Sequence, residues 1–285
     1  MFSVHTEGQL VHTLPEGRAV AGVTSLGDEI YLLRPKGGRD QVEVYDVTSY
    51  CLLRYLTVPN SGGFTDMTSC EHFLCLYIAD PGVECIHRLR LDLEGYSTKW
   101  PMNDVPWGVS VNASHNLIVT CSSVCKIKEL SPRGDLLRDV TLPDDVINPS
   151  LAIQLTNGNF IVCHGDVGDG IHRVCKISGD GGHIINSHGG PRGSNTGQYS
   201  VPSHLAVDNN EFVFVVDVNN RRVTLLSPTL DYMRQVVSRD QFEWRPRRLC
   251  LDVQRRLLYV NDNEVNVRDS ADPAERVGRV LIFKF

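Results

Sequence analysis

A run of arginines between residues 221 and 256 is the chemical feature that stands out first in this sequence. The run holds nine arginines, four acidic residues and no lysine, so its charge is +5 in a chain of net charge −6. Guanidinium groups bind phosphates and carboxylates, and aromatic rings among them can stack on bases or fill a partner's pocket. The run therefore predicts a binding surface. Its candidate residues are Arg221, Arg239, Phe242, Trp244, Arg245, Arg247 and Arg248.

Histidines and cysteines could supply metal ligands, but their spacing does not favour a metal site. His164, His172, His183 and His188 fall on different expected strands and a glycine-rich loop, and the CSSVC motif that begins at Cys121 lacks a matching second pair. We therefore predict no catalytic residue, no metal and no cofactor. In a chain of this length, nine cysteines in or beside apolar runs indicate buried thiols and a reducing, cytoplasmic location.

The elements that must position these residues are short strands. Apolar runs separated by Gly, Pro, Asn and Asp recur in groups of four about every 40 residues, whereas helical periodicity is nearly absent. A repeat of four strands is typical of a β-propeller blade. The clearest repeat spans residues 202–237 and reads PSHLAVD, FVFVVD, RRVTLLSP and DYMRQVV.

We expect a single all-β domain over residues 1–285, folded as a six-bladed propeller of four-stranded antiparallel blades. The last repeat has only three strands, and GQLVHTL at residues 8–14 has the pattern of the missing outer strand. Pairing this N-terminal strand with the last blade would close the ring and cover a sheet edge. The blades are expected at residues 17–58, 64–101, 106–143, 149–189, 202–237, and 246–285 plus 8–14.

The repeat resembles the NHL repeat. The resemblance rests on a proline before the first strand, on Leu205–Asp208 and Val215–Asp217, and on the Asn-Asn and Arg-Val pairs that follow. It covers the whole chain and is weakest in the first two repeats. It implies that Asp217 and Arg222 form a structural pair across the tight turn. NHL propellers occur as readers of RNA or protein in tripartite-motif ubiquitin ligases, and also in zinc-dependent peptidyl-amidoglycolate lyases.

Propeller topology predicts which residues share a face. The turn between the second and third strands opens on the same face as the link to the next blade, so residues 219–221 and 239–248 should lie close together. Trp107 and Asp66 could line the mouth of the central channel on this face, where propellers commonly bind ligands. Packing of Trp107 and a turn position for Asp66 are equally open. Arg255 and Arg256 should lie on the opposite face.

Two classes of function remain open. A zinc lyase would need about three histidines at the starts of first strands, and only His204 stands at such a position. A calcium-dependent propeller would need several Asn, Asp and Glu side chains pointing into the channel, and Asp66 is the only carboxylate expected there. We therefore expect a monomeric, non-enzymatic interaction module that reads a protein, a peptide or single-stranded RNA, as the recognition domain of a TRIM-like ubiquitin ligase would. The alternative is a metal-dependent propeller enzyme. No apolar run approaches the roughly 20 residues of a membrane span, so no membrane contact is expected.

Overall fold

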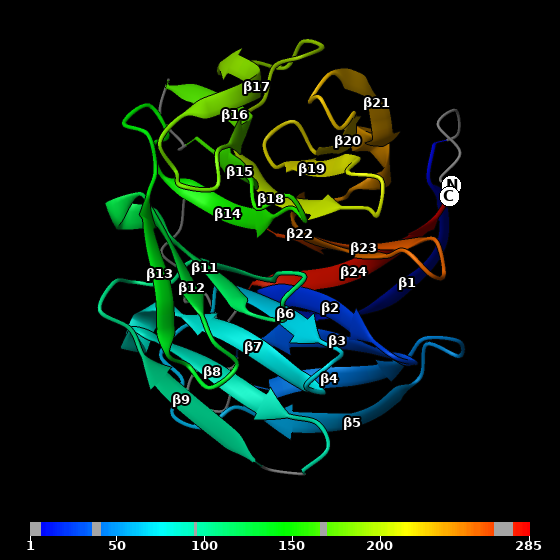
Figure 1. Ribbon diagram of the computed structural model, residues 1–285. Helices are drawn as coiled ribbons and strands as arrows, with labels where there is room; N and C mark the ends of the chain where they lie inside the picture. Colours follow the sequence, from blue (N-terminus) through cyan, green and yellow to red (C-terminus); the bar gives the residue numbers. More distant parts are fainter. Residues whose placement is uncertain (1–6, 36–40, 94–95, 166–169, 265–275) are drawn as a thin grey trace.

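The computed structural model describes residues 7–35, 41–93, 96–165, 170–264 and 276–285. They form six four-stranded antiparallel sheets arranged as blades around a central axis (Figure 1). The predicted fold, an all-β six-bladed propeller, is confirmed. The described residues contain no α-helix, and their helical elements are three short 3-10 turns.

The first three blades follow one another directly along the chain, each running from the axis outward. Blade 1 consists of β2 (Gly22–Leu26), β3 (Glu29–Arg34), β4 (Gln41–Asp46) and β5 (Leu52–Thr57). Blade 2 consists of β6 (Asp66–Cys70), β7 (Cys75–Asp80), β8 (Cys85–Arg90) and β9 (Ser97–Pro101). Blade 3 consists of β10 (Gly108–Val111), β11 (Leu117–Cys121), β12 (Lys126–Leu130) and β13 (Leu136–Thr141).

The next two blades repeat this plan, and the last one departs from it. Blade 4 consists of β14 (Pro149–Gln154), β15 (Phe160–His164), β16 (Ile171–Ile177) and β17 (Ile184–Pro191). Blade 5 consists of β18 (Pro202–Val207), β19 (Val213–Asp217), β20 (Arg222–Leu226) and β21 (Tyr232–Val237). Blade 6 consists of β22 (Arg245–Asp252), β23 (Leu257–Asn263), β24 (Val277–Lys284) and the N-terminal strand β1 (Gln9–Arg18).

Strand β1 closes the ring, as expected from the incomplete last repeat. It pairs antiparallel with β24, with Leu14 opposite Val280, so that the two ends of the chain lie side by side (Figure 1). Register shifts follow Leu10 and Leu14, and pairing continues to Arg18 opposite Val277. Leu14 is fully buried in a cluster with Tyr259 and Ile282, which anchors the strand to the blade.

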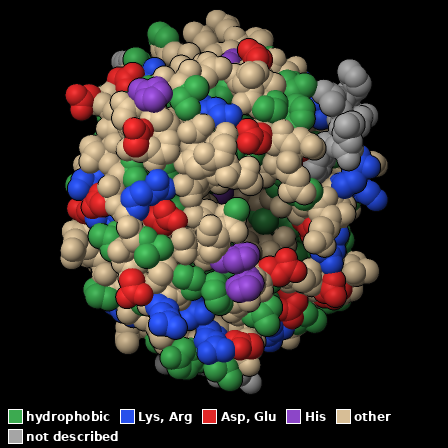
Figure 2. All heavy atoms as spheres, viewed as in Figure 1, with side chains coloured by type: hydrophobic (Ala, Val, Ile, Leu, Met, Phe, Trp, Pro, Cys, Tyr) green, Lys and Arg blue, Asp and Glu red, His purple; other side chains and the backbone are tan. Residues whose placement is uncertain are grey.

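The core lies between neighbouring blades. Middle strands such as β7, β15 and β19 are buried along their whole length because each blade packs face to face against the next one. The outer strand β5 is largely exposed, in keeping with its place at the rim. On the face drawn in Figure 2, basic and acidic side chains are interspersed, and a hollow lies near the centre.

Two further findings bear on the environment of the protein. In the part of the chain that the structure describes, no helix is long and apolar enough to cross a membrane. All nine cysteines lie in that part and are free thiols, and most of them are buried.

Candidate functional site at the channel mouth

The first strands of all six blades meet at the axis and bring an acidic, an imidazole and a basic side chain together. Asp66 comes from β6, His204 from β18 on the opposite side of the ring, and Arg248 from β22. His204 Nε2 and Arg248 Nε each lie 3.3 Å from Asp66 Oδ1. Arg248 also donates to the carbonyl of Thr65 at 2.6 Å from Nη2. Because the three side chains meet across the axis, they fill the channel at this level.

The charge of Asp66 is held in place by its neighbours. Burial disfavours the carboxylate, but His204, Arg248 and the backbone N–H of Val109 outweigh burial, so the pKa of Asp66 lies below its ordinary value. Asp66 is 1% exposed. The carboxylate of Asp66 is therefore a buried link between blades and does not face a ligand at the channel mouth, which corrects the expectation that it would line the mouth.

A hollow of about 190 Å³ lies beside the cluster of Asp66, His204 and Arg248, at the mouth of the channel. Blades 1, 2, 3 and 6 contribute to its wall, including Phe64, Thr65, Trp107, Arg247, Arg248, Glu264 and Arg276. Trp107 is 38% exposed, so its ring offers an apolar surface to a ligand. The structure thus places Trp107, Arg247 and Arg248, three of the residues singled out in the sequence, around one recess.

Arg247 is the polar group of this recess that is free to bind a ligand. It is solvent-accessible, and no described acidic side chain lies within ion-pair distance of its guanidinium. Partial burial, followed by the charges of Arg248, Arg276 and Arg245, lowers the pKa of Arg247 to about 10. Arg247 is therefore still cationic at neutral pH, and an anion would relieve the repulsion among these arginines.

Two arginines of the expected surface are engaged in hydrogen bonds within the chain. Arg221 donates from Nη2 to the carbonyls of Phe242 and Glu243, and Arg245 Nη1 donates to Asn219 Oδ1 at 2.7 Å. These contacts tie the turn of blade 5 to the link that leads into blade 6. The two segments are close neighbours, as topology predicted, but their guanidiniums bind each other's chain.

The aromatic residues of that surface do not form a stacking platform. Phe242 is 3% exposed and packs edge-on against Phe283, so the expectation that it is available to a ligand is wrong. Trp244 is partly buried, with the guanidinium of Arg279 5.1 Å from the centre of its ring. Arg239 is exposed and lies with Arg221 beside a shallow depression away from the channel mouth. The predicted patch is therefore not one continuous surface.

The pair implied by the NHL resemblance lies at the tight turn of blade 5. Arg222 Nε is 2.9 Å from Asp217 Oδ2, and Asp217 is fully buried. Its carboxylate also accepts from the backbone N–H of Ser200 at 2.8 Å and from the side chain of Asn220. Burial raises the pKa of Asp217 in spite of these donors. The pair fastens the turn to the link that precedes the blade.

The histidines and cysteines of blade 4 do not converge. His164 accepts from Arg173 Nε at 2.9 Å inside the blade, whereas His172 Nδ1 accepts from the backbone N–H of Val201. Cys163 and Cys175 lie on adjacent strands but belong to the cores on opposite faces of the blade. They therefore cannot form a cross-strand pair.

Two features escaped the sequence analysis. Arg276 follows a polar stretch of the sequence, and nothing in the local pattern indicates that it reaches the channel mouth. Asp80, Cys85 and His87 form a buried group in blade 2. Aligning the repeats would have revealed this group, because Cys85 stands five residues after Asp80 at the position that Arg222 takes after Asp217.

Comparison with known proteins supports the fold and leaves the function open. No protein-family model and no curated protein matches the sequence. The solved structures that resemble it include a PQQ-bound aldose sugar dehydrogenase from Streptomyces coelicolor (12% identity, 97% of each chain covered, TM-score 0.68). A streptogramin B lyase (12%, 97% of each chain, TM-score 0.63) and the WD40 propeller of Doa1 (12%, 97% of each chain, TM-score 0.61) are similar to it as well. A dehydrogenase, a lyase and a WD40 propeller all appear at about 12% identity, so these likenesses show the fold alone.

Proposed function

We propose that this chain is an interaction module that holds an anionic segment of a protein partner at the mouth of its channel. The observation that carries the proposal is Arg247, a solvent-accessible guanidinium without an acidic partner among the described residues, beside Arg276 and the exposed ring of Trp107. A carboxylate side chain or a chain terminus would pair with Arg247, and an adjacent apolar side chain would pack on Trp107.

A protein partner suits this site better than single-stranded RNA does. RNA binding needs a basic track with aromatic rings along it, so that successive bases can stack. Arg221 and Arg245 are committed to the backbone and to Asn219, Phe242 is buried, and Trp244 lies under Arg279. What remains is a compact recess, which suits the recognition of one or two side chains.

The wider role follows from the resemblance of the repeats. We propose an NHL-type propeller in the cytoplasm that serves as the recognition domain of a TRIM-like ubiquitin ligase or a related regulator. The Asp217–Arg222 pair and the free thiols support this assignment. A metal-dependent propeller enzyme is the alternative, because a lyase and a dehydrogenase are among the structures with a similar fold.

Fluorescence anisotropy with labelled probes tests the proposal. The probes are a peptide rich in Glu with one Leu, the same peptide with Gln in place of Glu, and a ten-nucleotide single-stranded RNA, each at two salt concentrations. We expect the acidic peptide to bind best, and Arg247→Ala with Arg276→Ala to weaken it about tenfold or more, since a hydrogen bond to a charged group contributes about 1.5 kcal/mol or more.

Arg256→Ala is the matched control, because this exposed arginine lies at the turn on the opposite face. Its affinity for the acidic peptide should equal that of the unmodified chain. Equal binding of the Glu and Gln peptides would refute the proposal. Preferential binding of the RNA with a steep salt dependence would replace it by the RNA version.

A further inference from the structure

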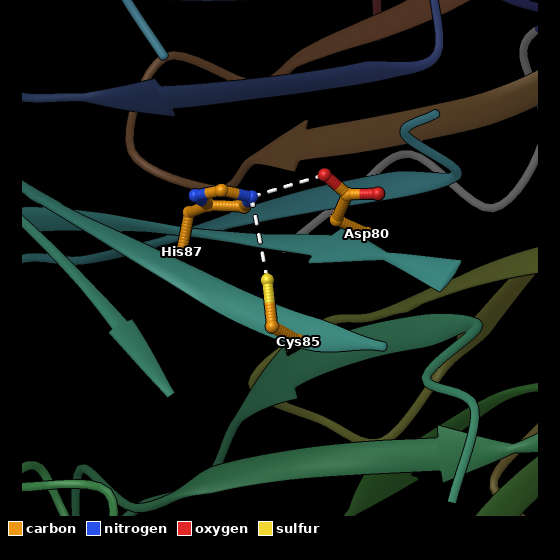
Figure 3. Close-up of side chains that lie close together, drawn as sticks. All are labelled: Asp80, Cys85 and His87. Atoms are coloured by element: carbon orange, nitrogen blue, oxygen red, sulfur yellow. Dashed lines mark hydrogen bonds and ion pairs between the residues drawn. The ribbon is translucent and has the colours of Figure 1, made fainter. Parts of the chain in front are cut away.

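A second chemical site lies inside blade 2, away from the channel mouth. Asp80 ends β7, and Cys85 and His87 stand on β8 after a tight 3-10 turn, Pro81–Val83. The three side chains point toward one another (Figure 3). His87 Nε2 lies 3.0 Å from Asp80 Oδ2 and 3.4 Å from Cys85 Sγ. The three donor atoms all lie within 4.8 Å of one another, and each residue is at most 1% exposed.

The same place in blades 5 and 6 holds an ion pair. Asp217 faces Arg222 across β19 and β20, and Asp262 faces Arg279 across β23 and β24. Their N···O distances are 2.9 and 3.1 Å. In each blade the aspartate also accepts from backbone N–H groups of the preceding inter-blade link, and the arginine supplies the balancing charge.

Blade 2 keeps the aspartate and lacks the arginine. Asp80 accepts from the backbone N–H of Gly62 at 2.9 Å, which is again the preceding link, but the residue opposite it is Cys85. A buried carboxylate without a balancing charge is costly. Here the side-chain partner of the carboxylate is His87 Nε2, and the thiol of Cys85 is directed at the same ring nitrogen.

We propose that Asp80, Cys85 and His87 bind a divalent metal ion, with zinc as the ion that their donor set favours. The ion would supply in blade 2 the positive charge that Arg222 and Arg279 supply in blades 5 and 6. A carboxylate oxygen, an imidazole nitrogen and a thiolate are all established zinc ligands, and zinc tolerates three protein ligands with a fourth position left to water.

The arrangement around the ring nitrogen favours a metal over a catalytic relay. In a nucleophile–histidine–acid triad, the acid binds one imidazole nitrogen and the nucleophile binds the other. In blade 2 both Asp80 and Cys85 face Nε2. One nitrogen carries at most one proton, so it cannot serve both partners well, whereas an ion at the centre satisfies all three.

Metal binding at this site must release a proton. A thiol binds a metal ion as the thiolate, so the proton on Cys85 must leave. Binding breaks the S–H bond, forms the metal–sulfur bond and passes the proton to solvent.

Cobalt provides a direct probe of the site in the full chain. After treatment with a chelator and its removal, titration with Co²⁺ should reach one equivalent and produce the near-ultraviolet sulfur-to-cobalt charge-transfer band together with visible bands of tetrahedral cobalt. Zinc should displace cobalt and abolish both signals. X-ray absorption of the zinc form should show one sulfur at about 2.3 Å and lighter ligands near 2.0 Å. The absence of a stoichiometric, sulfur-bound metal in the unmodified chain would overturn the proposal.

Variants identify the ligands and separate binding from folding. Cys85→Ser should lose the charge-transfer band, and Cys51→Ser, at an exposed thiol, should keep it. The double variant Cys85→Arg with His87→Thr copies the residues at the same register in blade 5, Arg222 and Thr224. It should fold and bind no metal, and its thermal midpoint should not change with chelator, whereas that of the unmodified chain should rise with zinc. A band that persists in Cys85→Ser, or zinc stabilisation that persists in the double variant, would count against these ligands.

Discussion

At the scale of single residues, each blade pairs two residues where its second and third strands meet, but the types of these residues differ from blade to blade. In each blade, a residue at or near the end of the second strand faces a residue at or near the start of the third strand. These pairs are Arg34 with Gln41, Asp80 with Cys85, Cys121 with Lys126, His164 with Arg173, Asp217 with Arg222, and Asp262 with Arg279. Two of the six are Asp–Arg pairs. The other four pairs have different residue types, which is one reason why their blades match the NHL pattern less closely than blade 5 does.

In blade 4 this position holds His164, whose burial should make the free energy of unfolding depend on pH. It is fully buried, and burial followed by the charge of Arg173 lowers its pKa to about 4. In the unfolded chain its pKa is about 6.5, so between these values the unfolded state binds one more proton than the folded state. The free energy of unfolding should therefore fall as the pH decreases from about 6.5 to 4.

Replacing His164 with Gln should remove this loss. Urea unfolding between pH 7 and pH 4 should show a decrease that is smaller in His164→Gln, by up to about 3 kcal/mol at the acidic end. His183→Gln is the matched control, since this exposed histidine should leave the pH dependence of the unmodified chain unchanged. Parallel pH profiles for His164→Gln and the unmodified chain would show that His164 titrates normally.

The charge run shows what a sequence cannot reveal at this scale. The number and order of the arginines are plain in the sequence, but whether a guanidinium is free depends on the carbonyls that the fold places beside it. Arg221 meets the carbonyls of Phe242 and Glu243, whereas the side chain of Arg247 makes no hydrogen bond to an acceptor among the described residues. Local sequence does not separate these two outcomes.

At the scale of elements, the alternation of apolar and polar residues predicted the strands well, and predicted their ends poorly. Strand β1 was expected at residues 8–14 and extends over Gln9–Arg18. Its last residues, Pro-Glu-Gly-Arg, carry no apolar signal, yet their backbone continues to pair with β24 as far as Val277. Backbone pairing across the ring is set by the partner strand, which lies more than 250 residues away in the sequence.

The closing strand should be held by the side chain that it buries. Leu14 is fully buried in a cluster that includes residues of β23 and β24, and Val11 on the same strand is 41% exposed. Leu14→Ala should lower the free energy of unfolding by about 2–4 kcal/mol, because it leaves a cavity at the closure. Val11→Ala should change it by less than about 0.5 kcal/mol. Chemical denaturation checks both, and equal effects would indicate that the closure does not depend on this side chain.

At the scale of the whole molecule, the ring is closed twice. Strand β1 joins the two ends of the chain at the rim, and the side chains of Asp66, His204 and Arg248 join blades 2, 5 and 6 at the axis. The sequence indicated the first closure through its incomplete last repeat. It could not indicate the second one, because contacts across the axis join residues of blades that are not neighbours in the chain.

The axial cluster should contribute far more to stability than a surface ion pair. Asp66 is the acidic partner of the buried Arg248, so Asp66→Asn should leave a buried, unpaired guanidinium and cost about 3 kcal/mol or more. Asp28→Asn is the matched control. The side chain of Asp28 is 84% exposed and pairs with Arg255, and its loss should cost at most about 1 kcal/mol.

A second substitution distinguishes loss of charge balance from loss of shape. In the Asp66→Asn background, Arg248→Met should restore part of the lost stability, since it removes the unpaired charge. Thermal and urea unfolding of the four proteins of this cycle give the coupling free energy between the two residues. If Asp66→Asn is no more destabilising than Asp28→Asn, or if Arg248→Met deepens the loss, the axis is held by packing and not by its charges.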